Sequence, residues 1–222
     1  NNSCLLGSPS ALDIQGNKIA YSGYCIIKSG NTNVPIQRYY YNLIIIDIVS
    51  KQAIVSFNNA YHFAFSPNGD EIVYSEEIRG EAGSPASPGY KGGVWLYNFN
   101  TKSKKMILSA TVVAKDLNWS EHDGNIYFKT YPIILRYNVA KEKIEETSYK
   151  GVYFSYDGRY YVSTPGEGVN SKIYRTADNK EMVEWEKLLM KQNIIYFSFW
   201  SKKLNALVFC DGGDNYAIFD IG

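Results

Sequence analysis

The sequence lacks a dominant charge. Its 23 basic and 22 acidic side chains leave a formal net charge of +1. Proteins that bind DNA or RNA must neutralise many phosphates, so this balance argues against a nucleic-acid-binding function. The one basic cluster, residues 102–105, lies between two expected strands. We interpret it as a solvated hairpin turn.

Long apolar runs are also missing. The longest candidate, residues 43–49, is interrupted by Asp47 and is far shorter than the roughly 18 residues of a membrane span. We therefore expect no transmembrane segment. The chain begins with Asn1 rather than Met, so either a signal peptide or an upstream region has been removed. This beginning favours a periplasmic or extracellular protein.

Cysteine and histidine are scarce. The three cysteines, Cys4, Cys25 and Cys210, contain no C-x-x-C spacing, which argues against a zinc site and against a dense disulfide framework. Three cysteines allow one disulfide and one free thiol. The two histidines, His62 and His122, lack the clustered acids of a metal site, and we expect neither a metal nor a cofactor.

Aromatic residues are abundant, with 20 tyrosines and 10 phenylalanines, as expected of strands that pack face to face. Many of them belong to a recurring phrase: an aromatic residue, a serine, a turn containing Asp, Asn or Gly, and then an apolar-alternating strand. The phrase reads FSPNGDEIVYS at 65–75, WSEHDGNIYF at 119–128, FSYDGRYYVS at 154–163 and, without the glycine, FWSKKLNALVF at 199–209.

The spacing of the phrase predicts a β-propeller. Its serines at 66, 120, 155 and 201 recur at intervals around the roughly 40–50 residues of a four-stranded blade. We therefore expect an all-β, five-bladed propeller of four-stranded antiparallel blades that forms one domain over 1–222. The expected blades are 10–58, 59–110, 111–148, 149–192 and, together with 1–8, 193–222.

The last expected blade lacks an outermost strand. An unpaired edge invites aggregation, so propellers usually complete the final blade with a strand from the other terminus. We expect residues 3–6 to supply it. The alternative is that the chain is an excerpt whose further blades have been cut away.

Residues 178–192 are ambiguous because Met182, Trp185 and Leu188 could mark one face of a short helix. We predict a fourth strand of blade four near 181–185, followed by a short helical linker.

The phrase at 65–74 resembles the repeat of TolB-like, or WD-repeat-like, bacterial propellers: aromatic-Ser-Pro-Asp-Gly followed by Ile-x-Phe or Ile-x-Tyr. The later copies depart from it through an insertion before Asp123, Tyr156 in place of proline, and a lost turn in the last copy. Family members look like protein-interaction modules of cell envelopes or propeller halves of peptidases. The repeat itself carries no catalytic residue.

The turn residues of the phrase have structural roles. Asp or Asn followed by Gly supplies the left-handed residues of a tight hairpin, and the preceding Ser can bond the turn backbone. We therefore interpret the Asn68, Asp123 and Asp157 turns as structural, not as calcium-binding or catalytic.

The longest insertions all join the second and third strands of a blade, at 28–38, 78–93 and 165–171. Such connections lie on one face of a propeller, and loops longer than about 12 residues are usually functional or disordered. Simple tolerance of insertions is the alternative. The residues that we expect to bind a partner lie on or beside these loops: Arg38, Tyr61, Arg79, Tyr90, Tyr131, Lys150 and Glu167.

Enzyme interpretations have less support. A five-bladed glycosidase needs facing carboxylates on inner strands, and Asp13 and Asp116 are the only acids in first-strand patterns. A serine peptidase would need a separate domain with a Gly-x-Ser-x-Gly elbow, which is absent from this sequence. We expect a non-enzymatic module, monomeric in isolation, that binds another protein. A carbohydrate-binding or glycoside-hydrolysing propeller is the alternative.

Overall fold

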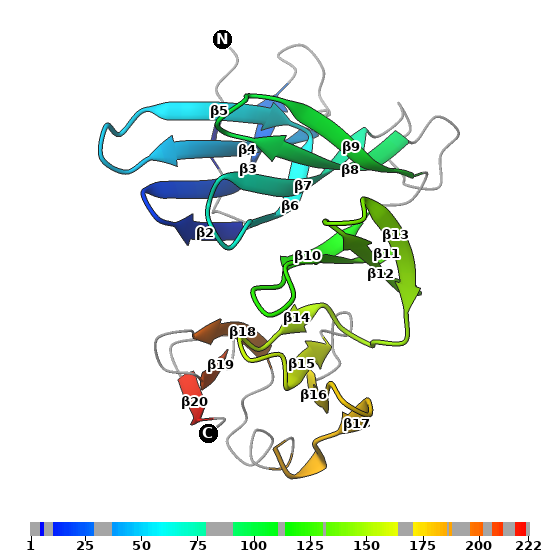
Figure 1. Ribbon diagram of the computed structural model, residues 1–222. Helices are drawn as coiled ribbons and strands as arrows, with labels where there is room; N and C mark the ends of the chain where they lie inside the picture. The colour runs from blue at the N-terminus through cyan, green and yellow to red at the C-terminus, as the bar shows by residue number, and fades with distance from the viewer. Residues whose placement is uncertain are drawn as a thin grey trace. The chain divides into compact units, whose positions relative to one another are not determined.

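In the computed structural model (Figure 1) the chain divides into two compact units, residues 1–119 and 120–222, and each unit is described by itself. The residues that it describes are 5–6, 11–28, 37–78, 91–110, 114–130, 132–163, 171–185, 187, 196–201, 206–210 and 216–220. In these residues the regular structure is antiparallel β, apart from a short helical segment that begins at residue 183.

The first unit contains two antiparallel sheets. The first sheet has the order β1-β3-β4-β5, with β2 also paired to β3; its strands are β1 (Leu5–Leu6), β2 (Ala11–Gln15), β3 (Lys18–Lys28), β4 (Gln37–Asp47) and β5 (Ala53–Asn58). The second sheet is a four-stranded meander of β6 (Ala60–Phe65), β7 (Glu71–Ile78), β8 (Lys91–Asn98) and β9 (Lys104–Ala110). The unit ends with β10 (Lys115–Trp119), which is the first strand of a third sheet.

The second unit continues the series. The third sheet follows β10 with β11 (Ile126–Thr130), β12 (Ile133–Asn138) and β13 (Lys143–Thr147). The fourth is formed by β14 (Tyr153–Phe154), β15 (Tyr160–Ser163), β16 (Lys172–Arg175) and β17 (Lys180–Glu181). The fifth contains β18 (Tyr196–Ser201), β19 (Ala206–Cys210) and β20 (Tyr216–Asp220). The predicted all-β class and four-stranded antiparallel sheets are confirmed. The five-bladed ring and the blade boundaries stay predictions.

The recurring phrase forms the same corner in three sheets. The backbone N–H of Ser66, Ser120 and Ser155 donates over 2.9 Å to the carbonyl five residues later, and the serine carbonyl accepts the N–H of the turn glycine over 2.9 Å. The glycines have φ of 74°, 69° and 71°, a left-handed conformation that costs other residues about 1–2 kcal/mol.

The turn side chains complete this corner, as predicted. Ser155 Oγ donates to Asp157 Oδ1 over 2.7 Å, and the same carboxylate oxygen accepts the Arg159 N–H over 2.9 Å. Ser66 Oγ bonds Asn68 Oδ1 over 2.7 Å in the same way. Burial alone would raise the pKa of Asp157, but the hydrogen bonds from Arg159 and Ser155 hold it below its usual value. The expected structural role is therefore confirmed for Asn68 and Asp157.

Successive corners interlock within each unit. Gln15, just before the first-sheet turn, donates from Nε2 to the Pro67 carbonyl over 2.5 Å, and its Cγ would lie 3.1 Å from a Cβ at Gly69. The same relation recurs in the second unit, where a Cβ at Gly158 would lie 2.2 Å from His122 Cδ2. Gly69 and Gly158 are thus needed both for their φ angles and for the close approach of the preceding corner.

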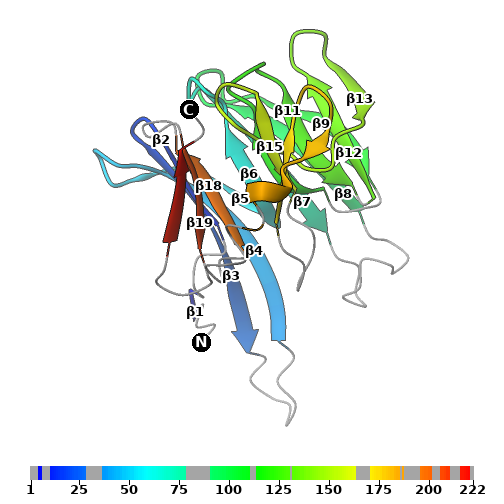
Figure 2. The ribbon, with the colours of Figure 1, turned by 90° about the horizontal axis from the view of Figure 1, so that it is seen from below.

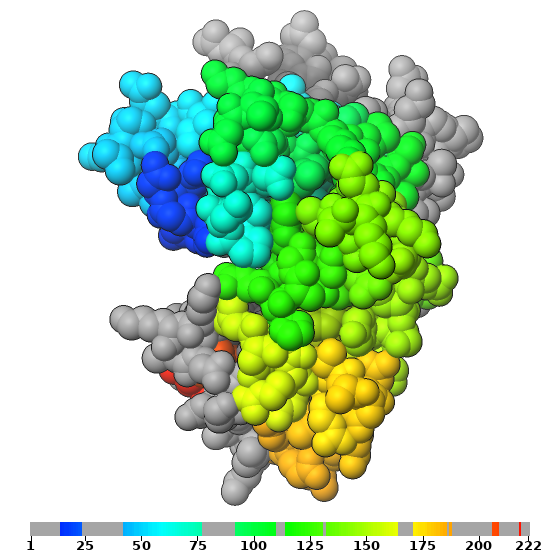
Figure 3. Space-filling view, viewed as in Figure 1, coloured from blue at the N-terminus to red at the C-terminus, as the bar shows by residue number. Residues whose placement is uncertain are grey.

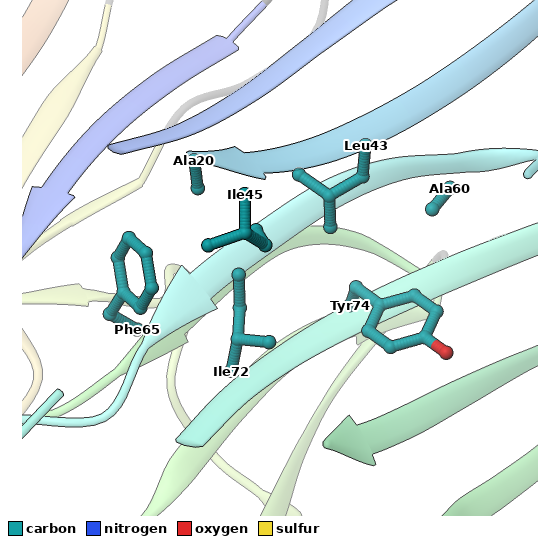
Figure 4. Close-up of a cluster of buried hydrophobic side chains, with 7 residues drawn as sticks. All are labelled: Ala20, Leu43, Ile45, Ala60, Phe65, Ile72 and Tyr74. Atoms are coloured by element: carbon teal, nitrogen blue, oxygen red, sulfur yellow. The ribbon is translucent and has the colours of Figure 1, made fainter. Parts of the chain in front are cut away.

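The core of the first unit lies between its two sheets (Figure 4). Leu43 and Ile45 from β4 face Ile72 and Tyr74 from β7, and all four are fully buried. Each such side chain contributes about 1.5–3 kcal/mol through burial. Phe57 extends this core by stacking on Tyr74 with ring centres 4.3 Å apart.

The second unit has two cores. One joins the third and fourth sheets through Tyr127, Phe154, Tyr161 and neighbouring apolar residues. The other joins the fourth and fifth sheets through Val162, Ile173 and Leu207, which are fully buried. Apolar side chains from successive sheets therefore meet on both faces of the fourth sheet, as blade packing in a propeller requires.

The prediction for the N-terminal strand is wrong. Leu5 and Leu6 pair with Ile26 and Cys25 of β3 in the first sheet, and do not add a fourth strand to the fifth. The reason is that β3 is longer than β2, which pairs with one edge of β3 only from Lys18 to Ser22. The remaining half of the edge of β3 is available, and β1 pairs there.

The last strand of the fourth sheet is also shorter than expected. The predicted strand at 181–185 is β17 at Lys180–Glu181, and the chain becomes helical at residue 183. Met182 is the last residue to bond β16, through its N–H to the Ile173 carbonyl over 2.9 Å. Trp185 then bonds back to Met182 over 3.0 Å, which turns the chain away from the sheet.

The interlocked corners predict unequal effects of two glycine substitutions. Gly124→Ala should lower the free energy of unfolding by about 1 kcal/mol, because its φ is 69° but nothing lies within 4 Å of the added Cβ. Gly158→Ala should cost about 1–3 kcal/mol more because of the contact with His122. Urea denaturation measures both values.

His122→Ala provides the control. It should remove most of the additional cost of Gly158→Ala and leave the cost of Gly124→Ala unchanged. Equal destabilisation by the two glycine substitutions would contradict the interlock.

Candidate functional site

The long connections leave their sheets from corresponding strand ends. The β3–β4 ladder ends at Lys28 opposite Gln37, and the β7–β8 ladder ends at Ile78 opposite Lys91. The β15–β16 ladder ends at Ser163 opposite Lys172. In each sheet this end lies opposite the end formed by the turn between the first and second strands. The strand ends beside the three connections of the predicted site therefore belong to the part of the chain that the structure describes.

The sequence-predicted site residues are described to different extents. Arg79, Tyr90, Tyr131 and Glu167 lie outside the described residues, and Arg38 is described only through its backbone pairing with Ile27. Tyr61 and Lys150 are described with their side chains, Tyr61 in the first unit and Lys150 in the second. Their surroundings form the two described parts of the candidate site.

The first sheet projects at the end that carries the 29–36 connection. β3 and β4 continue to pair from Gly23–Asn42 to Lys28–Gln37, whereas β5 pairs with β4 only as far as Asn42. Figure 2 shows β3 and β4 running on past the neighbouring strands. Within the described residues, the β4 segment 37–41 has a backbone edge without a partner strand. Unpaired edges of this kind accept further strands or peptides.

Tyr61 lies at a bulge near the start of β6. The pairing of β6 with β7 shifts register between Ala60 and Phe63, and bulges commonly re-aim side chains beside functional sites. The rings of Tyr61 and His62 meet edge to face, with centres 4.4 Å apart. The His62 N–H donates to Ser75 Oγ over 3.3 Å. The bulge therefore places an aromatic pair at the same end of the second sheet as its long connection.

His62 is neutral at physiological pH. Burial, followed by the positive charge of Lys115, lowers its pKa to about 4. It packs as a half-buried, uncharged side chain against the Tyr61 ring.

Lys150 precedes the first strand of the fourth sheet and contacts an aromatic stack. Its Nζ lies 5.0 Å from the ring centre of Tyr174, which stacks on Tyr161 at 5.2 Å. Its backbone N–H donates to Tyr161 Oη over 3.4 Å, and this hydroxyl donates to Asn179 Oδ1 over 3.0 Å. Asn179 Nδ2 in turn bonds Ser148 Oγ over 3.1 Å. The backbone of Lys150 is thus fixed while its side chain remains exposed.

Burial shifts the pKa of tyrosine hydroxyls in the described residues. Burial raises the pKa of the Tyr161 hydroxyl to about 12, so this group stays protonated and acts as a hydrogen-bond donor. Burial also raises the pKa of Tyr74. Among the side chains that the structure describes, no group of three or more His, Cys, Asp or Glu is placed to hold a metal ion. The helical segment of the described chain is not long and apolar enough to span a membrane.

Sequence reasoning missed two charged and aromatic groups. Lys104 reaches from β9 across Trp95, with Nζ 3.8 Å from the ring centre and 3.3 Å from Glu76 Oε2. Arg159 and Arg175 both lie beside Tyr160 at the turn end of the fourth sheet. Both groups depend on strand register across connections of irregular length, which the sequence pattern does not reveal.

Comparison with solved structures identifies the fold. Residues over 98% of the chain superpose on acylaminoacyl peptidase from Pyrococcus horikoshii, with a TM-score of 0.58 at 11% identity. The β-propeller domain of the Trilobed protease from Pyrococcus furiosus matches 81% of the chain, with a TM-score of 0.52 at 17% identity. TolB from Acinetobacter baumannii aligns with 74% of the chain and 40% of its own length at 18% identity and a TM-score of 0.49, and the fold assignment rests on the first two.

These similarities establish a β-propeller fold and no particular activity. They confirm, at the level of the fold, the resemblance to TolB-like propellers. The chain spans 39% of the Pyrococcus horikoshii peptidase and 57% of the Trilobed protease chain. No family model matches the sequence, and no curated protein does.

The buried state of His62 predicts a pH-dependent stability. Its pKa is about 4 in the folded chain and 6.5 in the unfolded chain, so the unfolded chain binds the proton first as the pH falls. The stabilisation is complete above pH 6.5 and decreases between pH 6.5 and 4, by about 2 kcal/mol at pH 5. Urea denaturation at pH 7.5 and pH 5 measures this difference.

Substitution of His62 tests this assignment. His62→Gln should reduce the stability difference between the two pH values, because it removes the imidazole whose pKa burial lowers. An unchanged pH dependence in His62→Gln would refute the assignment.

Proposed function

We propose that the chain is a non-enzymatic propeller module that binds another protein outside the cytoplasm. The binding surface is formed by the connections 28–38, 78–93 and 165–171 and by the strand ends beside them. A propeller fold is compatible with many functions, so the proposal rests on these strand ends rather than on the fold.

The projecting β3–β4 ladder is the observation that carries this proposal. Five residue pairs, from Tyr24–Tyr41 to Lys28–Gln37, extend the first sheet past the end of its β4–β5 pairing. A backbone ladder that projects in this way offers area and hydrogen-bonding groups to a partner.

The described side chains at these strand ends support a protein partner. Tyr61 packs on His62, and Lys150 lies over Tyr174. Tyrosine is enriched in protein interfaces because it buries a large area at a low cost in conformational entropy. Arg38, Arg79 and Tyr90 are of the residue types that dominate interface energies.

The glycosidase alternative depends on Asp13 and Asp116. Each belongs to a first strand, Asp13 opposite Ala20 in β2 and Asp116 in β10 with a φ of 51°. The left-handed backbone of Asp116 is typical of a turn-like position, where Asp bonds local backbone groups. This supports a structural role for Asp116, and mutation of these two acids remains the decisive test of hydrolysis.

The proposal predicts that Arg79→Ala combined with Tyr90→Ala weakens partner binding by about 2–4 kcal/mol without loss of the fold. The partner is first captured from an envelope extract of the source organism and identified by mass spectrometry. Its affinity for the purified parent chain and the double variant is then measured by calorimetry.

Lys141→Ala combined with Lys143→Ala is the matched control, because both residues are exposed on the β12–β13 hairpin. The proposal fails if the Arg79 and Tyr90 variant binds the captured protein with unchanged affinity. It also fails if the parent chain hydrolyses a glycan and loses that activity on Asp13→Asn or Asp116→Asn.

A further inference from the structure

The turn end of the fourth sheet carries an exposed cluster of cationic and aromatic side chains. Tyr160, Arg175 and Lys180 form one row across β15, β16 and β17, and paired residues of a row share a face of the sheet. Trp185 packs against Tyr160 with ring centres 5.0 Å apart. The Arg159 guanidinium lies 5.6 Å from the centre of the same tyrosine ring. We call these five residues the arginine corner.

Both guanidinium groups are held by aspartates of their own turns. Arg175 donates from Nε to Asp178 Oδ1 over 3.0 Å and from a terminal nitrogen to Asp178 Oδ2 over 2.5 Å. Arg159 Nε donates to Asp157 Oδ2 over 2.5 Å. These side chains stay exposed, at 49% for Arg159 and 45% for Arg175. Exposed pairs of this kind contribute little to stability, so their main effect is to fix the orientation of the guanidinium groups.

The fixed orientation suits carboxylate binding. A guanidinium has five N–H donors, and the pair with Asp178 uses two of those on Arg175. The outer N–H groups of an arginine match a second carboxylate in a forked geometry. Because the side chain is already ordered, an incoming carboxylate causes a smaller loss of conformational entropy.

The charge count favours a protein over a polyanion. The corner has three cations, Arg159, Arg175 and Lys180, interspersed with Asp157 and Asp178. Membrane surfaces and nucleic acids are usually bound by larger groups of uncompensated cations, about four to eight for anionic lipids. A mixture of Arg, Tyr and Trp is characteristic of the energetic centres of protein interfaces.

The apolar part of the corner has stable support. Tyr160 and Trp185 pack on the core formed by Val162, Ile173 and Leu207, so the aromatic rings are held in place without a partner. Figure 3 shows the surface over β15–β17, in yellow to orange, on the outside of the second unit. Within the sheet, this end lies opposite the one that carries the 164–170 connection.

We propose that the arginine corner is a second binding surface, which takes an acidic segment of a partner protein whose carboxylates alternate with aromatic side chains. The carboxylates bind Arg159 and Arg175, and an aromatic side chain packs beside Tyr160 and Trp185. The proposal is independent of the proposed function, since it uses none of the residues of the long connections.

Fluorescence anisotropy with a labelled octapeptide of alternating glutamate and tyrosine tests the proposal. The parent chain should bind this peptide more tightly at 50 mM than at 200 mM salt, about the range over which screening of exposed charges becomes strong. Arg159→Ala combined with Arg175→Ala should weaken binding about tenfold, as expected from the loss of charge-assisted hydrogen bonds. Circular dichroism verifies the fold of each variant.

Two comparison variants make the result specific. Lys141→Ala combined with Lys143→Ala removes the same charge from the third sheet and should leave peptide affinity unchanged. Arg159→Lys combined with Arg175→Lys keeps the charge and should give an intermediate loss, because lysine lacks the forked geometry.

Three results would overturn the proposal. The first is equal weakening by the arginine and lysine alanine variants, which would indicate attraction by net charge alone. The second is equal affinity for an octapeptide of alternating lysine and tyrosine. The third is binding of phosphatidylserine vesicles or of inorganic phosphate at this corner without binding of the acidic peptide.

Discussion

Each sheet of this chain depends on its neighbours for stability. Its strands have two to eleven residues, and a small isolated sheet buries too little apolar area to be stable by itself. The serine corner makes the stacking specific. At Gly69 and Gly158 the glycine provides both the left-handed turn and the space for a side chain from the preceding corner. The contacts of Gln15 with the 66–69 turn and of His122 with Gly158 are two examples of one relation. Sheets that stack through this relation bury apolar side chains on successive faces, as Leu43 and Ile72 do.

This constraint applies to one end of each sheet. Where two corners are in contact, as at Gly69 and Gly158, the turn between the first and second strands must stay short and regular. The connections between second and third strands have no such requirement, and they vary from the two residues between β11 and β12 to the twelve between β7 and β8. Within each sheet that has a long connection, this connection lies at the other end, and the proposed protein-binding residues lie on or beside it. The arginine corner shows that the regular end can also expose side chains suited to binding.

The sequence was sufficient to predict the corner and the sheets because the phrase depends on local chemistry: a serine, a turn acid or amide, and a glycine. It was insufficient for β1, since pairing at the edge of β3 depends on how far β2 covers that edge. The position of Arg175 beside Tyr160 was also hidden, because it depends on the register between β15 and β16 across a connection of irregular length. At the candidate site, the sequence indicated Tyr61 and Lys150 but not the bulge or the tyrosine stack beside them.

The central claim is that successive serine corners interlock. Proton–proton distances measured by NMR test this claim most directly. At 25.2 kDa the chain is within reach of this method with isotope labelling. The account predicts nuclear Overhauser effects between the His122 ring and the Gly158 α protons, and between the Gln15 side chain and Gly69. Absence of both contacts, in a chain whose Ser66 and Ser155 turns show their own internal contacts, would contradict it.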